Sequence, residues 1–267
     1  MRFFQAAIVF FIIGASASCT KNSVTGRNQF LLIPQAEILS LSRQQYATFL
    51  SQNRVVKGTR DAQKVETIGR KIAQALTVYY QQQGNTSIAR DYAWEFNLVN
   101  DNAVNAWCMP GGKVVVYTGL LPVSQNDDAM AAVMGHEIAH AIAEHGNERM
   151  TQGMVKEAGG AALSVMLSTK PEATRNLFMS AYGAGSAVGI LLPFSRKQEL
   201  EADRFGLIFS ALAGYNPDAA IEFWQRMSKA SGGNTVPELL STHPSDETRI
   251  AKIRIYAEEA KKYVVAR

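Results

Sequence analysis

The sequence is poor in cysteine, in clustered basic residues and in long apolar runs. There are only two cysteines among 267 residues, and because Cys19 lies at the end of an apolar N-terminal segment, a disulfide framework is not expected. The formal charge is only +4, and without a dense run of lysine and arginine the chain is not expected to bind nucleic acid. The apolar N-terminal stretch is too short to span a membrane, and charged residues interrupt the Ala/Gly/Met-rich region 151–193.

The composition of the sequence is that of a globular protein with a sizeable hydrophobic core. Hydrophobic residues make up 47% and charged residues 19% of the chain. No repeat of fixed length is present. A chain of this length can hold one large domain or two small ones, and we predict a single domain over residues 35–267.

The N-terminus has the order of a secretory signal peptide, predicted over residues 1–18. Arg2 precedes an apolar segment, Phe3 to Gly14, and small residues follow at positions 15–18. Cys19 comes directly after them, where a lipoprotein carries its lipidated cysteine, although no leucine stands three residues before it.

We predict lipidation at Cys19 and a lipidated leader over residues 19–34; the alternative is ordinary cleavage after Ala17. Lipidation would anchor the chain in a membrane of the cell envelope, facing the periplasm, with the outer membrane favoured.

The strongest chemical signal is the pentapeptide from His136 to His140, with Glu137 second. Two histidines four apart on a helix point the same way and can bind one Zn²⁺. The glutamate between them can take a proton from water activated by the metal. Asn126 can cap this helix, which we expect from about residue 129 to 143, and Gly146 offers a stop.

Simpler interpretations exist for these histidines. The pentapeptide can arise by chance, with both rings making ordinary hydrogen bonds. A further histidine, His145, falls five residues after His140. Because it lies off the predicted ligand face, we expect it to be a solvated residue near the negative end of the helix.

A second helix, predicted over residues 194–213, offers a third metal ligand. Glu199 and Asp203 share one face of it with small residues that would let another helix approach, whereas Glu201 points about 200° away. A catalytic zinc site needs three protein ligands, so Glu199 is the candidate, with Asp203 holding a ligand histidine. The alternative is a charged solvent-facing surface, which we expect for Glu201 and Arg204.

A strand and a hairpin are predicted before the metal-binding helix. Residues 94–99 alternate as a strand does, and a hairpin from Asn105 leads into the β-branched run Lys113 to Thr118. Pro110 cannot sit in a central strand, so part of this hairpin should lie at a sheet edge. Such an edge could bind an extended peptide, although a plain structural hairpin is the simpler interpretation. Cys108 is expected to be buried.

Most of the remaining chain is predicted to be helical. The region Thr151 to Pro193 should form two packed helices or, alternatively, a mobile cover. Further helices are expected over residues 35–52, 61–82, 218–229 and, from a cap near Ser245, to about Tyr263.

Three segments together resemble one family. His136–His140, Glu199–Gly206 and Thr242–Ser245 are similar to the motifs of zinc metallopeptidases of the HtpX, BepA and Oma type, the group that includes the CAAX prenyl proteases. Asn105–Trp107 resembles that family's substrate-strand segment, and Val24–Arg27 the leader of its exported lipoprotein members.

This resemblance implies an α+β, mainly helical, gluzincin-like fold with a small β-sheet beside the metal-binding helix. It implies one Zn²⁺ per chain held by His136, His140 and Glu199, with Glu137 as the base. It also implies that His243 lies near the metal. Prenylated substrates are not carried over, because the membrane-spanning segments of those members are missing here.

We therefore expect a zinc endopeptidase that cleaves misfolded or unassembled envelope proteins, with Asn105, Ala106 and Trp107 holding the peptide. The alternative is a chaperone-like assembly factor whose zinc site is mainly structural. His243 precedes a proline, which disfavours helix at that position. It could be a fourth ligand that blocks the site, a donor to the developing oxyanion, or a surface histidine in a turn.

Overall fold

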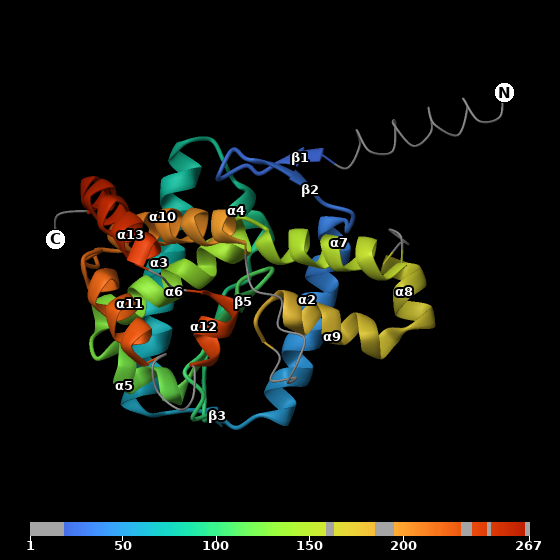
Figure 1. Ribbon diagram of the computed structural model, residues 1–267, viewed down its shortest axis with the longest axis horizontal. Helices are drawn as coiled ribbons and strands as arrows, with labels where there is room; N and C mark the ends of the chain where they lie inside the picture. The colour runs from blue at the N-terminus through green and yellow to red at the C-terminus, as the bar shows by residue number, and fades with distance from the viewer. Residues whose placement is uncertain (1–18, 159–162, 185–194, 231–236, 245–246, 265–267) are drawn as a thin grey trace.

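The computed structural model describes residues 19–158, 163–184, 195–230, 237–244 and 247–264 (Figure 1). The predicted signal peptide, residues 1–18, lies outside these ranges, as does the expected cap at Ser245. Among the helices of these ranges, none combines the length and the apolar character that crossing a membrane requires.

The strands of the described residues form one hairpin and one mixed sheet. Strand β1 (Cys19–Lys21) pairs antiparallel with β2 (Asn28–Phe30). The sheet has the order β3-β4-β6-β5, and only β4 and β6 run parallel. Strand β5 therefore lies at an edge, as Pro110 predicts. The strands of the sheet are β3 (Val55–Val56), β4 (Glu95–Val99), β5 (Ala106–Met109) and β6 (Lys113–Tyr117).

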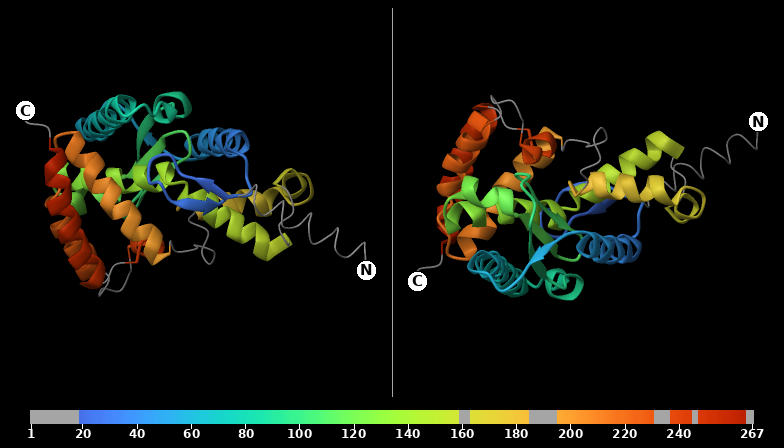
Figure 2. Two further views of the ribbon diagram at one scale, coloured as in Figure 1. Left: turned by 90° about the horizontal axis from the view of Figure 1, so that it is seen from above. Right: turned by 90° about the horizontal axis from the view of Figure 1, so that it is seen from below.

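Helices surround the sheet, so the predicted α+β, mainly helical architecture is confirmed (Figures 1 and 2). The α-helices are α2 (Gln35–Gln52), α3 (Arg60–Gln82), α4 (Ser87–Asp91), α5 (Leu121–Ser124), α6 (Asp127–Ile142), α7 (His145–Ala158), α8 (Leu163–Thr169), α9 (Pro171–Ala181), α10 (Arg196–Leu212), α11 (Ala219–Ala230), α12 (Glu238–Thr242) and α13 (Glu247–Ala260), with 3₁₀ turns η1 (Thr118–Leu120) and η2 (Lys261–Tyr263).

Alternation along the strands divides the core in two. Val114 and Val116 of β6 face a cluster with α3 and α6, whereas Val115 and Tyr117 face a cluster with α2, α7 and α9. Successive strand side chains point to opposite faces, and both faces of β6 are covered, which explains its continuous apolar run. The right-hand view of Figure 2 shows the sheet edge-on between α3 and α2.

Helices α6 and α10 make an unusually close contact through two glycines. A Cβ on Gly135 would come within 2.5 Å of the Gly206 carbonyl oxygen, and a Cβ on Gly206 within 2.7 Å of the His136 Cα. Side chains at either position would hold the helices apart. The small residues expected beside Glu199 therefore bring α10 against the helix that carries the histidines.

The end of α6 differs from the prediction. Asn126 caps its start by accepting from the Ala129 N–H at 2.8 Å, as expected. The helix ends at Ile142, and Glu144, with φ of 55°, turns the chain into α7. The expected stop at Gly146 is wrong, because Gly146 lies inside α7, where a Cβ would strike the Tyr182 ring.

Within the region Thr151 to Pro193, α7 and α9 pack against each other in the second core cluster. Helix packing in this region is as expected, but its described residues belong to three helices, α7, α8 and α9, and not to two. Residues 159–162 and 185–193 of that region lie outside the described ranges, so a mobile cover there stays a prediction.

Candidate metal centre

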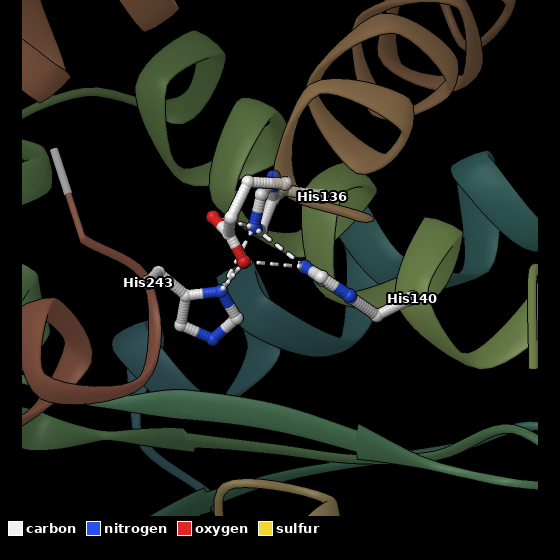
Figure 3. Close-up of side chains that lie close together, drawn as sticks. His136, His140 and His243 are labelled. Atoms are coloured by element: carbon white, nitrogen blue, oxygen red, sulfur yellow. Dashed lines mark hydrogen bonds and ion pairs between the residues drawn. The ribbon is translucent and has the colours of Figure 1, made fainter. Parts of the chain in front are cut away.

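The rings of His136 and His140 lie one turn apart on the same face of α6. Their Nε2 atoms are 3.0 Å apart, and both residues are only 3% exposed. Helix periodicity places residues i and i+4 side by side. Figure 3 shows these rings converging with His243 on one point above the sheet.

Glu199 joins the two histidines because α10 crosses α6 at the paired glycines. Its Oε1 lies 3.3 Å from His140 Nε2, and its Oε2 lies 3.6 Å from His136 Nε2. Burial opposes ionisation of Glu199, yet the charge of Arg249 and the contact with His243 hold its pKa well below the usual range. The carboxylate is therefore present as an anion among imidazoles.

His243 completes a buried four-residue group. Its Nδ1 lies 3.1 Å from His136 Nε2 and 3.0 Å from Glu199 Oε1. The residue follows α12 with φ of −123°, outside the helical region as the next proline requires, and it is 1% exposed. The interpretation of His243 as a surface histidine is therefore wrong.

The spacing of this group fits a zinc ion. Ligand atoms of His136, His140, Glu199 and His243 all lie within 4.8 Å of one another. With zinc-to-nitrogen distances of about 2.0–2.1 Å, tetrahedral ligands are separated by about 3.3–3.4 Å. In five of the six pairs of these residues the separations are 3.0–3.6 Å, around that value. Four lone pairs directed at one point also need a cation between them, so the residues present fit the metal.

Glu137 lies beside the group. Its side chain is buried, its Oε1 has no hydrogen-bond partner among the described residues, and that oxygen is 3.5 Å from His243 Nε2. Burial raises the pKa of Glu137, although the nearby histidines lower it in part. A carboxylate in this position can exchange a proton with water at the metal.

Asp203 and Arg249 support the group from one side. Asp203 Oδ1 is 3.0 Å from His136 Nδ1, which leaves the His136 Nε2 lone pair for the metal. Arg249 donates to both oxygens of Asp203 at 2.8 Å, and its Nη1 lies 2.7 Å from Glu199 Oε2. The guanidinium also stacks on Trp224, 3.9 Å from the ring centroid.

Sequence reasoning missed Arg249, although a signal existed. Arg249, Ile253 and Ala257 follow a spacing of four along α13, and all three are buried. An arginine on an apolar helix face needs an anionic partner. Here the partners are Asp203 and Glu199.

His145 and Glu201 also differ from their predictions. His145 is fully buried as the first residue of α7; its Nδ1 is 2.8 Å from His140 Nδ1 and its Nε2 is 2.9 Å from Glu201 Oε2. The expectation of a solvated His145 is wrong because Glu144 turns the chain back toward α6. The side chain of Glu201 is 12% exposed, so a solvent-facing Glu201 is also wrong, whereas Arg204 is about half exposed, as expected.

Asn105, Ala106 and Trp107 lie at the start of the edge strand β5. The Asn105 amide donates to the Gly183 carbonyl and to Glu238 of α12. Ala106 faces the core cluster of α6, whereas Trp107 is buried on the opposite face with its ring 4.9 Å from Phe49. The Trp107 side chain points away from the metal group, so Trp107 could contact a peptide only through its backbone.

Known proteins with similar sequences are named as metalloendopeptidases or proteases. The family model described as peptidase family M48 matches residues 59–257. The mitochondrial metalloendopeptidase OMA1 of Arabidopsis thaliana is 39% identical over 166 residues, covering 61% of this chain and 32% of the relative. OMA1 of Schizosaccharomyces pombe is 39% identical over 174 residues, 64% of this chain and 48% of the relative.

A bacterial relative is also similar. The beta-barrel assembly-enhancing protease of Escherichia coli K12 is 30% identical over 177 residues, covering 64% of this chain and 36% of the relative. The chain thus spans less than half the length of each of these three relatives. The family match contains His136 and His140 of α6, Glu199 and His243, whose side chains meet in the structure. On this match, which covers most of its length, the chain belongs to peptidase family M48, a family of zinc metallopeptidases.

Proposed function

We propose that this protein is a zinc-dependent endopeptidase that cleaves misfolded or unassembled proteins of the cell envelope. The observation that carries the proposal is the buried Glu137 carboxylate beside a group of three histidines and Glu199. A purely structural zinc site has no need of such a base. The names of the relatives, mitochondrial metalloendopeptidases and a beta-barrel assembly-enhancing protease, support protein substrates and an envelope setting.

In the proposed mechanism His136, His140 and Glu199 hold the metal. Bound zinc supplies Lewis acidity, which polarises the scissile carbonyl and acidifies the attacking water. Glu137 accepts the proton of that water and then delivers it to the leaving nitrogen. The backbone of Asn105, Ala106 and Trp107 at the edge of β5 would hold the peptide extended, by adding it as a further strand.

His243 gives the proposed site two states. With His243 in the group, four protein side chains would be available to hold the metal, which is the number found in closed, structural zinc sites. Catalysis needs an open position, so His243 would have to withdraw as substrate binds. Once withdrawn, it could donate to the developing oxyanion. This arrangement would protect exported proteins from stray cleavage.

The proposal is tested with purified protein, casein and a Glu137→Gln variant. The wild type should cleave casein, a chelator should stop cleavage, and added zinc should restore it. Glu137→Gln should keep one zinc per chain but lose about 10²–10⁴-fold in rate, because only the proton transfer is removed. Near-normal turnover by the variant would contradict the mechanism.

We also propose that residues 1–18 are removed and that Cys19 carries lipid, which would anchor the protein in the outer membrane, facing the periplasm. Cys19 opens strand β1, so the attachment point would lie directly at the start of the folded domain. Wild-type protein should label with fatty acid and sediment with membranes, whereas Cys19→Ser should do neither. A wild-type protein with an unmodified mature end would contradict lipidation.

A further inference from the structure

The hairpin formed by β1 and β2 closes the end of the helix that carries the metal-binding histidines. The Asn22 amide donates to the Ile142 carbonyl at 2.8 Å, and the Gln29 amide donates to the Ala143 carbonyl. The last carbonyls of a helix lack partners within the helix and must find them elsewhere. Both donors come from residues 19–30, outside the segment 59–257 that matches the peptidase family.

From the same hairpin, Arg27 reaches two helices. Its Nη1 and Nη2 bind both oxygens of Glu148 on α7, at 2.7 and 2.6 Å, and its Nε donates to Glu201 Oε2 on α10 at 2.7 Å. The side chains of these three residues are 11–17% exposed. A guanidinium with all of these contacts fixes the position of the Glu201 carboxylate, because its planar fork defines the geometry.

Glu201 is in turn bonded to His145, and His145 to His140. Since Glu201 is an acceptor, the 2.9 Å contact requires His145 Nε2 to carry hydrogen. His145 Nδ1 then keeps its lone pair and accepts from His140 Nδ1–H across 2.8 Å. The remaining lone pair of His140 is on Nε2, the atom that faces Glu199. With the ring hydrogens placed in this way, every contact in the series Arg27–Glu201–His145–His140 has one donor and one acceptor.

We propose that the N-terminal hairpin of β1 and β2 contributes to zinc binding. Arg27 is a positioning residue that acts through Glu201 and His145 to set the orientation and tautomer of His140. His136 has the corresponding support directly from Asp203. The inference rests on the proposed role of His140 as a ligand. It makes the leader, which carries Cys19, necessary for full metal affinity.

The test uses the purified chain with Arg27→Ala, Arg27→Lys and Glu201→Gln, and with Arg204→Ala as the matched control. Arg204 lies on α10 and, like Arg27, forms a bidentate pair with a carboxylate, that of Glu259. About half of the Arg204 side chain is exposed, so this pair lies at the surface. Zinc affinity is measured by competition with a chelating dye. The visible absorption of Co²⁺-substituted protein reports the ligand geometry, and thermal unfolding is recorded alongside.

Loss of a partner behind a metal-binding histidine typically weakens metal binding about 10–100-fold. Arg27→Ala and Glu201→Gln should each weaken zinc binding about tenfold and alter the Co²⁺ spectrum. Arg27→Lys should lie between Arg27→Ala and wild type, and Arg204→Ala should match wild type. The Arg27→Ala/Glu201→Gln double variant should bind zinc no more weakly than Glu201→Gln alone, because both changes break one chain of contacts.

The inference is overturned if Arg27→Ala lowers the unfolding temperature while zinc affinity and the Co²⁺ spectrum stay unchanged, or if Arg204→Ala has an equal effect on zinc. If Arg27→Ala does not fold, Arg27→Lys and Glu201→Gln decide on the same criteria. A wild-type protein that binds no zinc would instead contradict the proposed function. The two failures are thereby distinguished.

Discussion

Glu199 and Glu201 are separated by one residue on α10, yet only Glu199 reaches the group of three histidines. Its Oε1 lies 3.0 Å from His243 Nδ1, whereas Glu201 contacts His145 and Arg27. The two residues differ by about 200° around the helix axis. The proposed ligand and the residue proposed to support His140 are thus two positions apart on one helix.

Substituting each of these glutamates separates the two roles. Glu199→Gln should weaken zinc binding by more than 100-fold, because it removes the anionic ligand and leaves Arg249 with one carboxylate fewer. Glu201→Gln should retain most of the zinc at saturating concentration, since all ligands remain. Metal content after dialysis, measured for both variants, checks the order. The reverse order would mean that Glu201 is the ligand.

His243→Ala should keep one zinc per chain, because His136, His140 and Glu199 remain. We expect faster cleavage of an unfolded protein, since the variant cannot close the site with a fourth ligand. A slower rate would assign His243 mainly to oxyanion stabilisation. Rates are compared at equal zinc occupancy, and indistinguishable rates would leave His243 without a role at the site.

At the scale of elements, local patterns predict most of the helices. The apolar spacing of residues 35–52 and 61–82 gives helices whose ends agree with α2 and α3 to within one residue. Pro110 correctly predicts an edge strand. The order β3-β4-β6-β5 could not be predicted, because parallel pairing of β4 with β6 depends on contacts between segments separated along the chain.

The same limit explains which site residues the sequence revealed. His136, Glu137 and His140 are found from spacing alone, and Glu199 from the need for a third ligand. His145 and Arg249 escaped because their partners lie on other elements: Glu201 on α10 for His145, and Asp203 for Arg249. Short-range periodicity carries no information about which helices will meet.

The α6–α10 crossing makes the site sensitive to a single methyl group. Gly206→Ala would place a Cβ 2.7 Å from the backbone N and Cα of His136, atoms that cannot move without shifting a helix. We expect destabilisation of about 1–3 kcal/mol and weaker zinc binding, because Glu199 moves with α10. Urea unfolding and zinc titration measure the two effects.

Gly153→Ala is the matched control for that substitution. Gly153 also lies inside a helix, and the nearest atom to its added Cβ is Cδ1 of Leu177, the end of a flexible side chain. Helix propensity alone favours alanine over glycine by about 0.5–1 kcal/mol. The control should therefore keep normal zinc affinity and stability near that of wild type. If both variants lost stability and zinc affinity equally, the close contact between α6 and α10 at Gly206 would not explain the loss.

At the scale of the whole molecule, the metal group joins segments that lie far apart in the sequence. Its residues come from α6, α10 and the turn after α12, and Arg249 of α13 donates to the His243 carbonyl and to Asp203. Such a set of buried polar groups forms only in the folded chain. Zinc should therefore bind the native state far more tightly than the unfolded state, which couples metal binding to folding.

Removing zinc should consequently lower the unfolding temperature of the entire domain. At free zinc 100-fold above the dissociation constant, linkage stabilises the native state by about 2.7 kcal/mol. For a chain of this size, each kcal/mol shifts the midpoint by about 2–4 °C, so chelation should lower it by about 5–10 °C. Differential scanning calorimetry with and without chelator measures the shift. Glu137→Gln should show the full shift because its ligands are intact, whereas Glu199→Gln should show little; a midpoint independent of zinc in the wild type would contradict the metal site itself.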